Sequence, residues 1–222
     1  MNDSIEVTKA CVERDIYDAN IFHTLMFRWV NGLVAINGFE RNFQGLFRYI
    51  RDALETKYIF ALAKLFANSK EAGLWKFIQQ AKAYPDEAIE IRLERVDELL
   101  RDRFRTKRQE FLSNFDHYEK RIREISEVIN PYRNIQRAHN FPWRENDKET
   151  TWIDTKEWLT FAETVFVQAV DGICHSCQRV GDFFPAEFNG EMDYFVSLFQ
   201  SSLEAAEAER LRLIKSPTVL NS

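Results

Sequence analysis

The stretch "FRTKRQEFLSNFDHYEKRIREISEVIN", residues 104–130, carries apolar side chains three or four positions apart. The same spacing extends back to Pro85, so the pattern covers some forty residues. Its members are Ile89, Leu93, Val96, Leu100, Phe104, Phe111, Phe115, Tyr118, Ile122, Ile125 and Ile129. A period near 3.6 residues is that of an α-helix with one buried face. The pattern predicts one very long helix, or two nearly collinear helices, after Pro85.

Helical spacing also dominates the rest of the chain, which has only seven glycines and five prolines in 222 residues. The further helices that it predicts cover residues 4–30, 39–66, 74–83, 154–179 and 190–213. With 45% apolar residues, the chain can bury one sizeable core. We therefore expect an all-α fold, a multi-helix bundle, with a single domain over residues 1–214 and a flexible tail over 215–222.

The overall composition excludes some function classes. The chain has 30 Lys and Arg against 35 Asp and Glu, a net charge of -5, which argues against indiscriminate binding of nucleic acid. No stretch approaches the roughly 18 consecutive apolar residues of a membrane span, and the N-terminus lacks the pattern of a signal peptide. Three cysteines, an odd count, favour reduced thiols over a disulfide framework. We expect a cytoplasmic protein that does not bind membranes.

One segment departs from this acidic balance. From Val128 to Arg144 there is no carboxylate, and "NPYRNIQRAHNFPW", residues 130–143, falls inside this window. Asn130-Pro131 predicts either a kink or a helix restart, with Asn130 as the N-cap and Pro131 in the first turn.

Within this window, Arg133 and His139 suit phosphodiester chemistry. A histidine can take and give protons near neutral pH, and a guanidinium can hold two phosphate oxygens at once. The alternative is that Arg133 and Arg137 are solvated helix residues and that the helix dipole favours His139 at a C-terminal end. The spacing alone decides little, but a site for a phosphate backbone must avoid acidic neighbours, and this window does.

"YRNIQRAHN", residues 132–140, resembles the R-x(4-6)-H motif of the HEPN superfamily of small helical domains, in particular its abortive-infection AbiU-like branch. "YIRDALETKYIFALAKLFANSKEAGLWKFI", residues 49–78, resembles an earlier helix of that branch. The family-like core covers about residues 45–141. The two segments occur in the family's order, which makes the resemblance more specific than either segment alone.

The resemblance implies a homodimeric HEPN-like bundle that cleaves RNA without a metal or other cofactor. The 2'-hydroxyl attacks the adjacent phosphate and leaves a cyclic phosphate and a free 5'-hydroxyl. His139 would act as general acid or base, Arg133 would stabilise charge on the phosphorus, and Asn134 would orient groups in the cleft. Arg137, Trp143 and Arg144 are the residues that we expect to bind RNA.

The resemblance also implies a role in a bacterial defence or toxin-antitoxin system, with a cognate antitoxin such as a nucleotidyltransferase as a possible partner. Two positions depart from the family pattern. Ile135 stands where the branch often has a basic residue, and Phe141 replaces a tyrosine that such a partner can modify with AMP in some members. A non-catalytic member that binds RNA, nucleotides or proteins is the alternative function.

Two other segments are weaker candidates. "RDRFRTKR", residues 101–108, could follow an RNA backbone, although acidic neighbours three or four positions away favour ordinary surface ion pairs.

Cys174 and Cys177 form a lone C-x-x-C, and a zinc site there would need help from residues such as His23 or His117. Buried thiols on a helix face are the better interpretation of this pair, so we predict no metal site.

Overall fold

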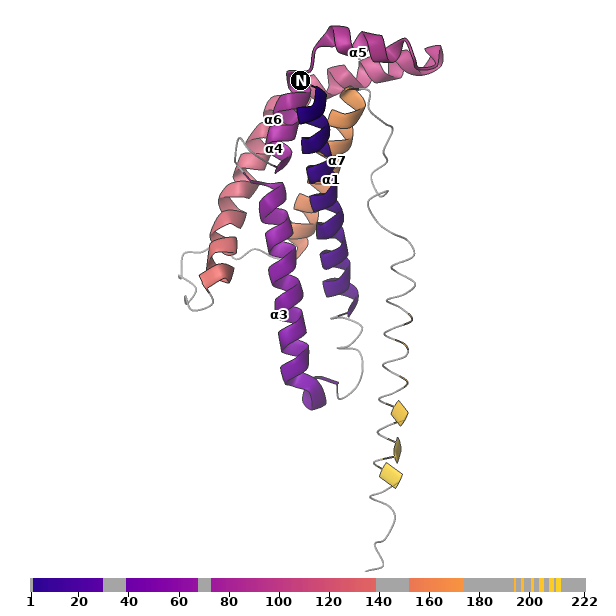
Figure 1. The fold of residues 1–222 in the computed structure, drawn as a ribbon. Coiled ribbons are helices and arrows are strands. Elements are labelled where there is room, and N and C mark those ends of the chain that lie inside the picture. The colour runs from indigo at the N-terminus through magenta and orange to yellow at the C-terminus, as the bar shows by residue number, and fades with distance from the viewer. Residues whose placement is uncertain are drawn as a thin grey trace, which may run out of the picture. The chain divides into compact units, whose positions relative to one another are not determined.

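The computed structural model describes residues 2–29, 39–67, 73–138 and 152–173, together with nine separate residues between 194 and 212. These ranges contain α1 (Asn2–Thr24), the π-helix η1 (Leu25–Trp29), α3 (Phe39–Leu65), α4 (Gly73–Lys82), α5 (Asp86–Leu93), α6 (Glu98–Ala138) and α7 (Trp152–Gly172), shown in Figure 1. The nine separate residues are helical as well, and the described part of the chain contains no strand. The predicted all-α fold is confirmed.

Contacts along the chain divide it into two compact units. One consists of Met1–His23 and Ala53–Phe184, and the other of Thr24–Asp52 and Pro185–Ser222. Everything that follows on the core and the candidate site concerns the first unit. The predicted single domain over 1–214, with its family-like core at 45–141, stays a prediction, and the predicted tail at 215–222 lies outside the described residues.

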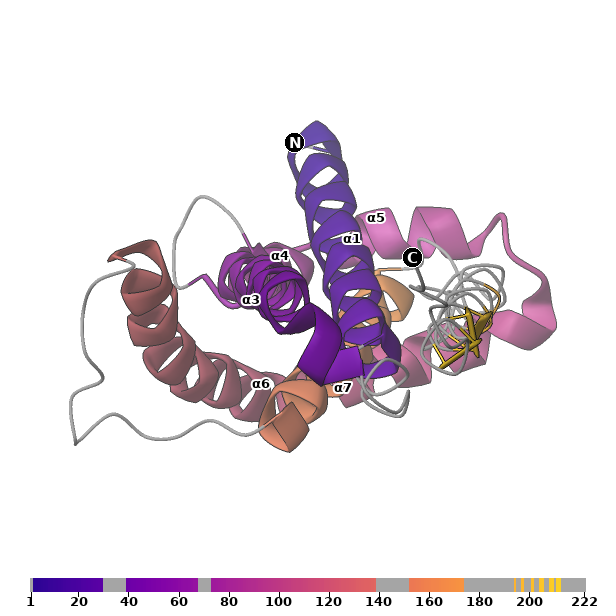
Figure 2. The same ribbon diagram turned by 90° about the horizontal axis from the view of Figure 1, so that it is seen from below.

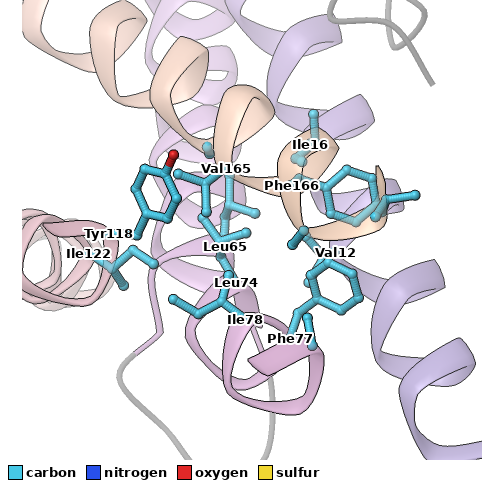
Figure 3. Close-up of a cluster of buried hydrophobic side chains, with 14 of the residues drawn as sticks. Val12, Ile16, Leu65, Leu74, Phe77, Ile78, Tyr118, Ile122, Val165 and Phe166 are labelled. Atoms are coloured by element: carbon cyan, nitrogen blue, oxygen red, sulfur yellow. The ribbon is translucent and has the colours of Figure 1, made fainter. Parts of the chain in front are cut away.

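The core of the first unit is formed by α1, α4, α6, α7 and the C-terminal part of α3. α7 packs against both α4 and α6. Figure 3 shows side chains from these helices meeting: Val12, Ile16, Leu65, Leu74, Phe77, Ile78, Tyr118, Ile122, Val165 and Phe166. The long apolar pattern faces this core as predicted, since all its members are buried except Val96, which is partly buried, and Leu100, which is exposed.

The prediction of one long helix or two nearly collinear helices after Pro85 is wrong. α5 ends at Leu93, a turn follows at residues 94–97, and α6 runs back beside α5, as Figures 1 and 2 show. Arg105 of α6 donates to Glu90 of α5 over 2.8 Å. Fifteen residues of collinear helix would place these two positions about 22 Å apart. The apolar spacing survives the turn, which is why periodicity alone did not reveal it.

The joint between α3 and α4 depends on a glycine. Gly73, the first residue of α4, has φ of +88°, a left-handed conformation that side chains rarely adopt. A Cβ at this position would lie 2.9 Å from the carbonyl oxygen of Lys64 and 3.0 Å from that of Leu65. The start of α4 can therefore approach the end of α3 only because residue 73 has no side chain.

α6 has 41 residues and passes through Pro131 to Ala138 without a break. A restart with Asn130 as N-cap is therefore wrong, because Asn130 and Pro131 both lie inside the helix. Figure 2 shows α6 as a curved helix.

Among the helices that the structure describes, none is long and apolar enough to cross a membrane.

Candidate functional site

The predicted RNA-cleaving motif begins near the C-terminal end of α6. Arg133, Asn134 and Arg137 belong to the last turns of this helix, and for them the structure describes the backbone only. His139, Trp143 and Arg144 lie outside the described residues. The side-chain geometry of the predicted site therefore stays a prediction, while the helical backbone beneath its first three residues is observed.

The turns just before the motif are fixed to the core. Ile125 and Ile129 are each only 1% exposed. On the adjoining face, the buried Ser126 accepts a hydrogen bond from the side-chain amide of Asn130 over 2.9 Å. Pro131, by contrast, is exposed. Apolar burial thus holds α6 in place up to two residues before Pro131 and four residues before Arg133.

In the second candidate, residues 101–108, four of the five basic side chains make contacts within the protein: Arg101, Arg105, Lys107 and Arg108. Arg101 donates to the carbonyl oxygens of Val96 and Glu94, each over 3.2 Å, and so satisfies the turn after α5. Arg105 bridges to Glu90 and, as the sequence spacing predicted, to Asp102. Lys107 pairs with Glu110 over 2.6 Å.

Arg108 is the most buried of these basic residues, with 8% of its surface exposed. It donates to the carbonyl oxygens of Ala81 at 2.7 Å, Lys82 at 3.2 Å and Tyr84 at 3.2 Å. The last carbonyls of a helix have no partner within it, so Arg108 acts as a cap for the end of α4. These contacts favour a structural role for residues 101–108 over a role in holding RNA.

Sequence reasoning missed a polar cluster that joins α1, α3 and α7 inside the first unit. The amide of Asn20 on α1 donates to the carboxylate of Glu163 on α7, and both side chains are buried. Tyr58 on α3 is fully buried and donates through its hydroxyl to the carbonyl oxygen of Thr155 over 3.1 Å. The one available signal was an acidic residue at a position with helical spacing from apolar ones, since Leu159 and Phe166 flank Glu163 four and three positions away.

His23 lies at the edge of this cluster, with its ring edge-on to that of Tyr58 at 5.5 Å between centroids. Burial, helped by the positive charge of Lys156, lowers the pKa of His23 to about 4. Burial also raises the pKa of Tyr58 well above its usual value. His23 is therefore neutral at physiological pH, and its ring contributes packing rather than charge.

The described residues contain no group of three or more His, Cys, Asp or Glu side chains that could hold a metal ion. Cys11 is an exposed free thiol, whereas Cys174 and Cys177 lie outside those residues. The expectations for this pair consequently stay predictions.

Comparisons of the chain with protein-family models, with curated proteins and with solved structures find no match.

Proposed function

We propose that the protein is a metal-independent endoribonuclease that acts as a homodimer through Arg133, Asn134 and His139. The observation that carries this proposal is the Arg133-x5-His139 motif within the carboxylate-free window from Val128 to Arg144. His139 serves as general acid or base, and Arg133 stabilises the charge that develops on phosphorus. Asn134 orients groups in the cleft.

The charge distribution along α6 supports this proposal. Upstream of the window, basic side chains of the helix have acidic partners within reach, for example Arg121 with Glu124 at 3.2 Å and Arg123 with Glu119 at 3.8 Å. No carboxylate within the window can neutralise Arg133 or Arg137 in this way. A polyanion such as RNA gains most from cations that have no competing partner nearby.

The homodimer is what the resemblance to the HEPN superfamily implies, and helix geometry is compatible with it. Residues six apart on a helix point about 120° from one another around its axis, so a single chain would splay Arg133 and His139 if the helix continued to residue 139. A second copy related by a two-fold axis supplies the missing group from the other side. Each cleft then contains groups from both chains, and neither chain is competent alone.

Arg137, Trp143 and Arg144 bind the RNA on either side of the scissile phosphate. The arginines contact phosphate oxygens, and the indole of Trp143 stacks on a base. By its resemblance to the AbiU-like branch, the protein acts in the cytoplasm in a defence or toxin-antitoxin system. A cognate antitoxin, such as a nucleotidyltransferase, is the partner that would restrain it.

The proposal is tested by incubating purified protein with mixed RNA in EDTA. We expect cleavage by the wild-type protein that leaves cyclic phosphate and 5'-hydroxyl ends, and a loss of about 10²- to 10⁴-fold in rate for His139→Ala, the range for removing a general acid or base. His117→Ala is the matched control, because His117 is an exposed histidine of α6 outside the motif. It should cleave at the wild-type rate.

Equal cleavage by wild-type protein and His139→Ala would show that the activity does not come from this site. Binding of RNA without any cleavage would identify the protein as a non-catalytic binding module. RNA with a 2'-deoxy sugar at the cut position should resist cleavage, because the attacking hydroxyl is then absent.

A further inference from the structure

Pro131 lies in the interior of α6, where proline is unfavourable. Proline is the least favourable residue in a helix interior, since it has no N–H and its ring presses on the preceding turn. α6 nevertheless continues on both sides of Pro131. The carbonyl of Glu127, four residues earlier, receives no helical hydrogen bond from residue 131.

The side chain of Pro131 itself adds no burial that would offset this cost. The side chain of Pro131 is exposed, whereas Ile129 is 1% exposed and Ser126 is 2% exposed. The bond from Asn130 to Ser126 fixes the turn before the proline. The helix is therefore held against the core up to Ile129, and its hydrogen-bond ladder is interrupted at Pro131.

The interruption stands two residues before Arg133, the first residue of the motif. Local violations that no packing offsets persist mainly where they serve function. Interior prolines are also the commonest cause of a sharp bend in a helix.

We propose that Pro131 is a positioning residue, a hinge that lets the motif-bearing turns of α6 bend away from the line set by the core-bound turns. This inference rests on the proposed function. The bend brings Arg133 to the phosphate while Ile129 and Ser126 hold the rest of the helix in place. Pro131 itself touches neither RNA nor the reacting atoms.

The test is Pro131→Ala, measured for thermal stability and for steady-state RNA cleavage. Because alanine restores the missing N–H, we expect a higher melting temperature. Because the bend is lost, we expect kcat to fall at least tenfold, while KM stays within twofold of the wild-type value. A purely structural proline would give the opposite pair of results, lower stability and unchanged turnover by the folded fraction.

Thr106→Ala is the matched control. Thr106 is exposed in an earlier turn of α6, where its hydroxyl donates to the carbonyl of Asp102 over 2.9 Å, and alanine there also raises helix propensity. This variant should be at least as stable as the wild type and fully active.

If wild-type protein cleaves RNA and Pro131→Ala matches its kcat, the hinge is refuted and the proposed function stands. A lower melting temperature for Pro131→Ala refutes the hinge as well. If the wild-type protein cleaves no RNA, the proposed function fails, and the hinge fails with it.

Discussion

Two parts of α6 use their charges in different ways. Residues 98–127 contain eight Lys or Arg and seven Asp or Glu, and several of them bind one another or neighbouring helices, as Arg105 does with Glu90. Residues 128–138 contain two arginines and no carboxylate. In the first part, charged side chains pair within the folded protein. The second part has no carboxylate of its own beside its two arginines, a sequence pattern that suits a site for an anionic ligand.

The largest expected difference between the two parts is in catalysis. Arg133→Ala should lower kcat/KM for RNA cleavage by about 10²- to 10³-fold, because a charge-stabilising contact in the transition state is lost. Arg123→Ala, in residues 98–127 of the same helix, should change kcat/KM by less than about twofold, since Arg123 is an exposed residue near Glu119. Similar losses for the two variants, in cleavage assays at fixed ionic strength, would remove the distinction.

The next effect concerns stability rather than activity. Arg108→Ala should lower the free energy of unfolding by about 3 kcal/mol, because carbonyl groups at the end of α4 lose their buried donor. Arg105→Ala should shift the urea midpoint little, because its ion pairs are exposed.

Arg105→Ala should also retain full RNA cleavage, since residues 101–108 serve the fold. A cleavage defect in this variant at unchanged stability would show that the RNA-binding surface extends into residues 98–127 of α6. Equal urea midpoints for the Arg108→Ala and Arg105→Ala proteins would mean that α4 does not depend on its cap.

The smallest expected effect is the pH dependence of stability that His23 causes. It distinguishes His23, a packing residue, from His139, the proposed catalytic residue. With a folded-state pKa of about 4, His23 stays neutral in the native protein while the unfolded chain protonates it below pH 6.5. Its contribution to stability therefore falls as pH drops from about 6.5 to about 4. His23→Phe should gain roughly 1 kcal/mol relative to wild type between pH 7.5 and pH 5, measured by urea unfolding at each pH.

Comparing the two proteins isolates His23, because buried carboxyl groups such as Asp15 and Asp171, whose pKa values are raised by burial, are present in both. The pH profile of RNA cleavage should be the same in His23→Phe and in the wild type. A pH-independent difference in stability between them would contradict the assigned state of His23. A changed activity profile would link this residue to the site.

The sequence was sufficient for the all-helical fold and for most of the buried face of α6. Phe111 and Ile122 are fully buried where the apolar spacing predicted a core-facing side chain. The turn at residues 94–97 was not predictable from that spacing, because Leu93 and Phe104 stay in register across it. No glycine or proline marks this turn, and its carbonyls are satisfied by Arg101, a partner that only the folded chain reveals.

Candidate sites were predictable only where the sequence itself carries the signal. The carboxylate-free window is a property of consecutive residues, so it could be read directly. The pairing of Asn20 with Glu163 joins residues 143 positions apart, and no local pattern encodes such a partnership. Arg108 looked like one member of a basic run, because its three carbonyl partners lie 24 to 27 positions earlier in the chain.

The cap that Arg108 supplies has a consequence for the order in which the chain can fold. α4 has ten residues, too few for a helix to be stable alone in water. During synthesis its end acquires its buried hydrogen-bond donor only when residue 108 has emerged and α6 has begun to form. A nascent chain that stops after α5 would therefore hold α4 as a fraying segment, which becomes fixed when the first turns of α6 dock against it.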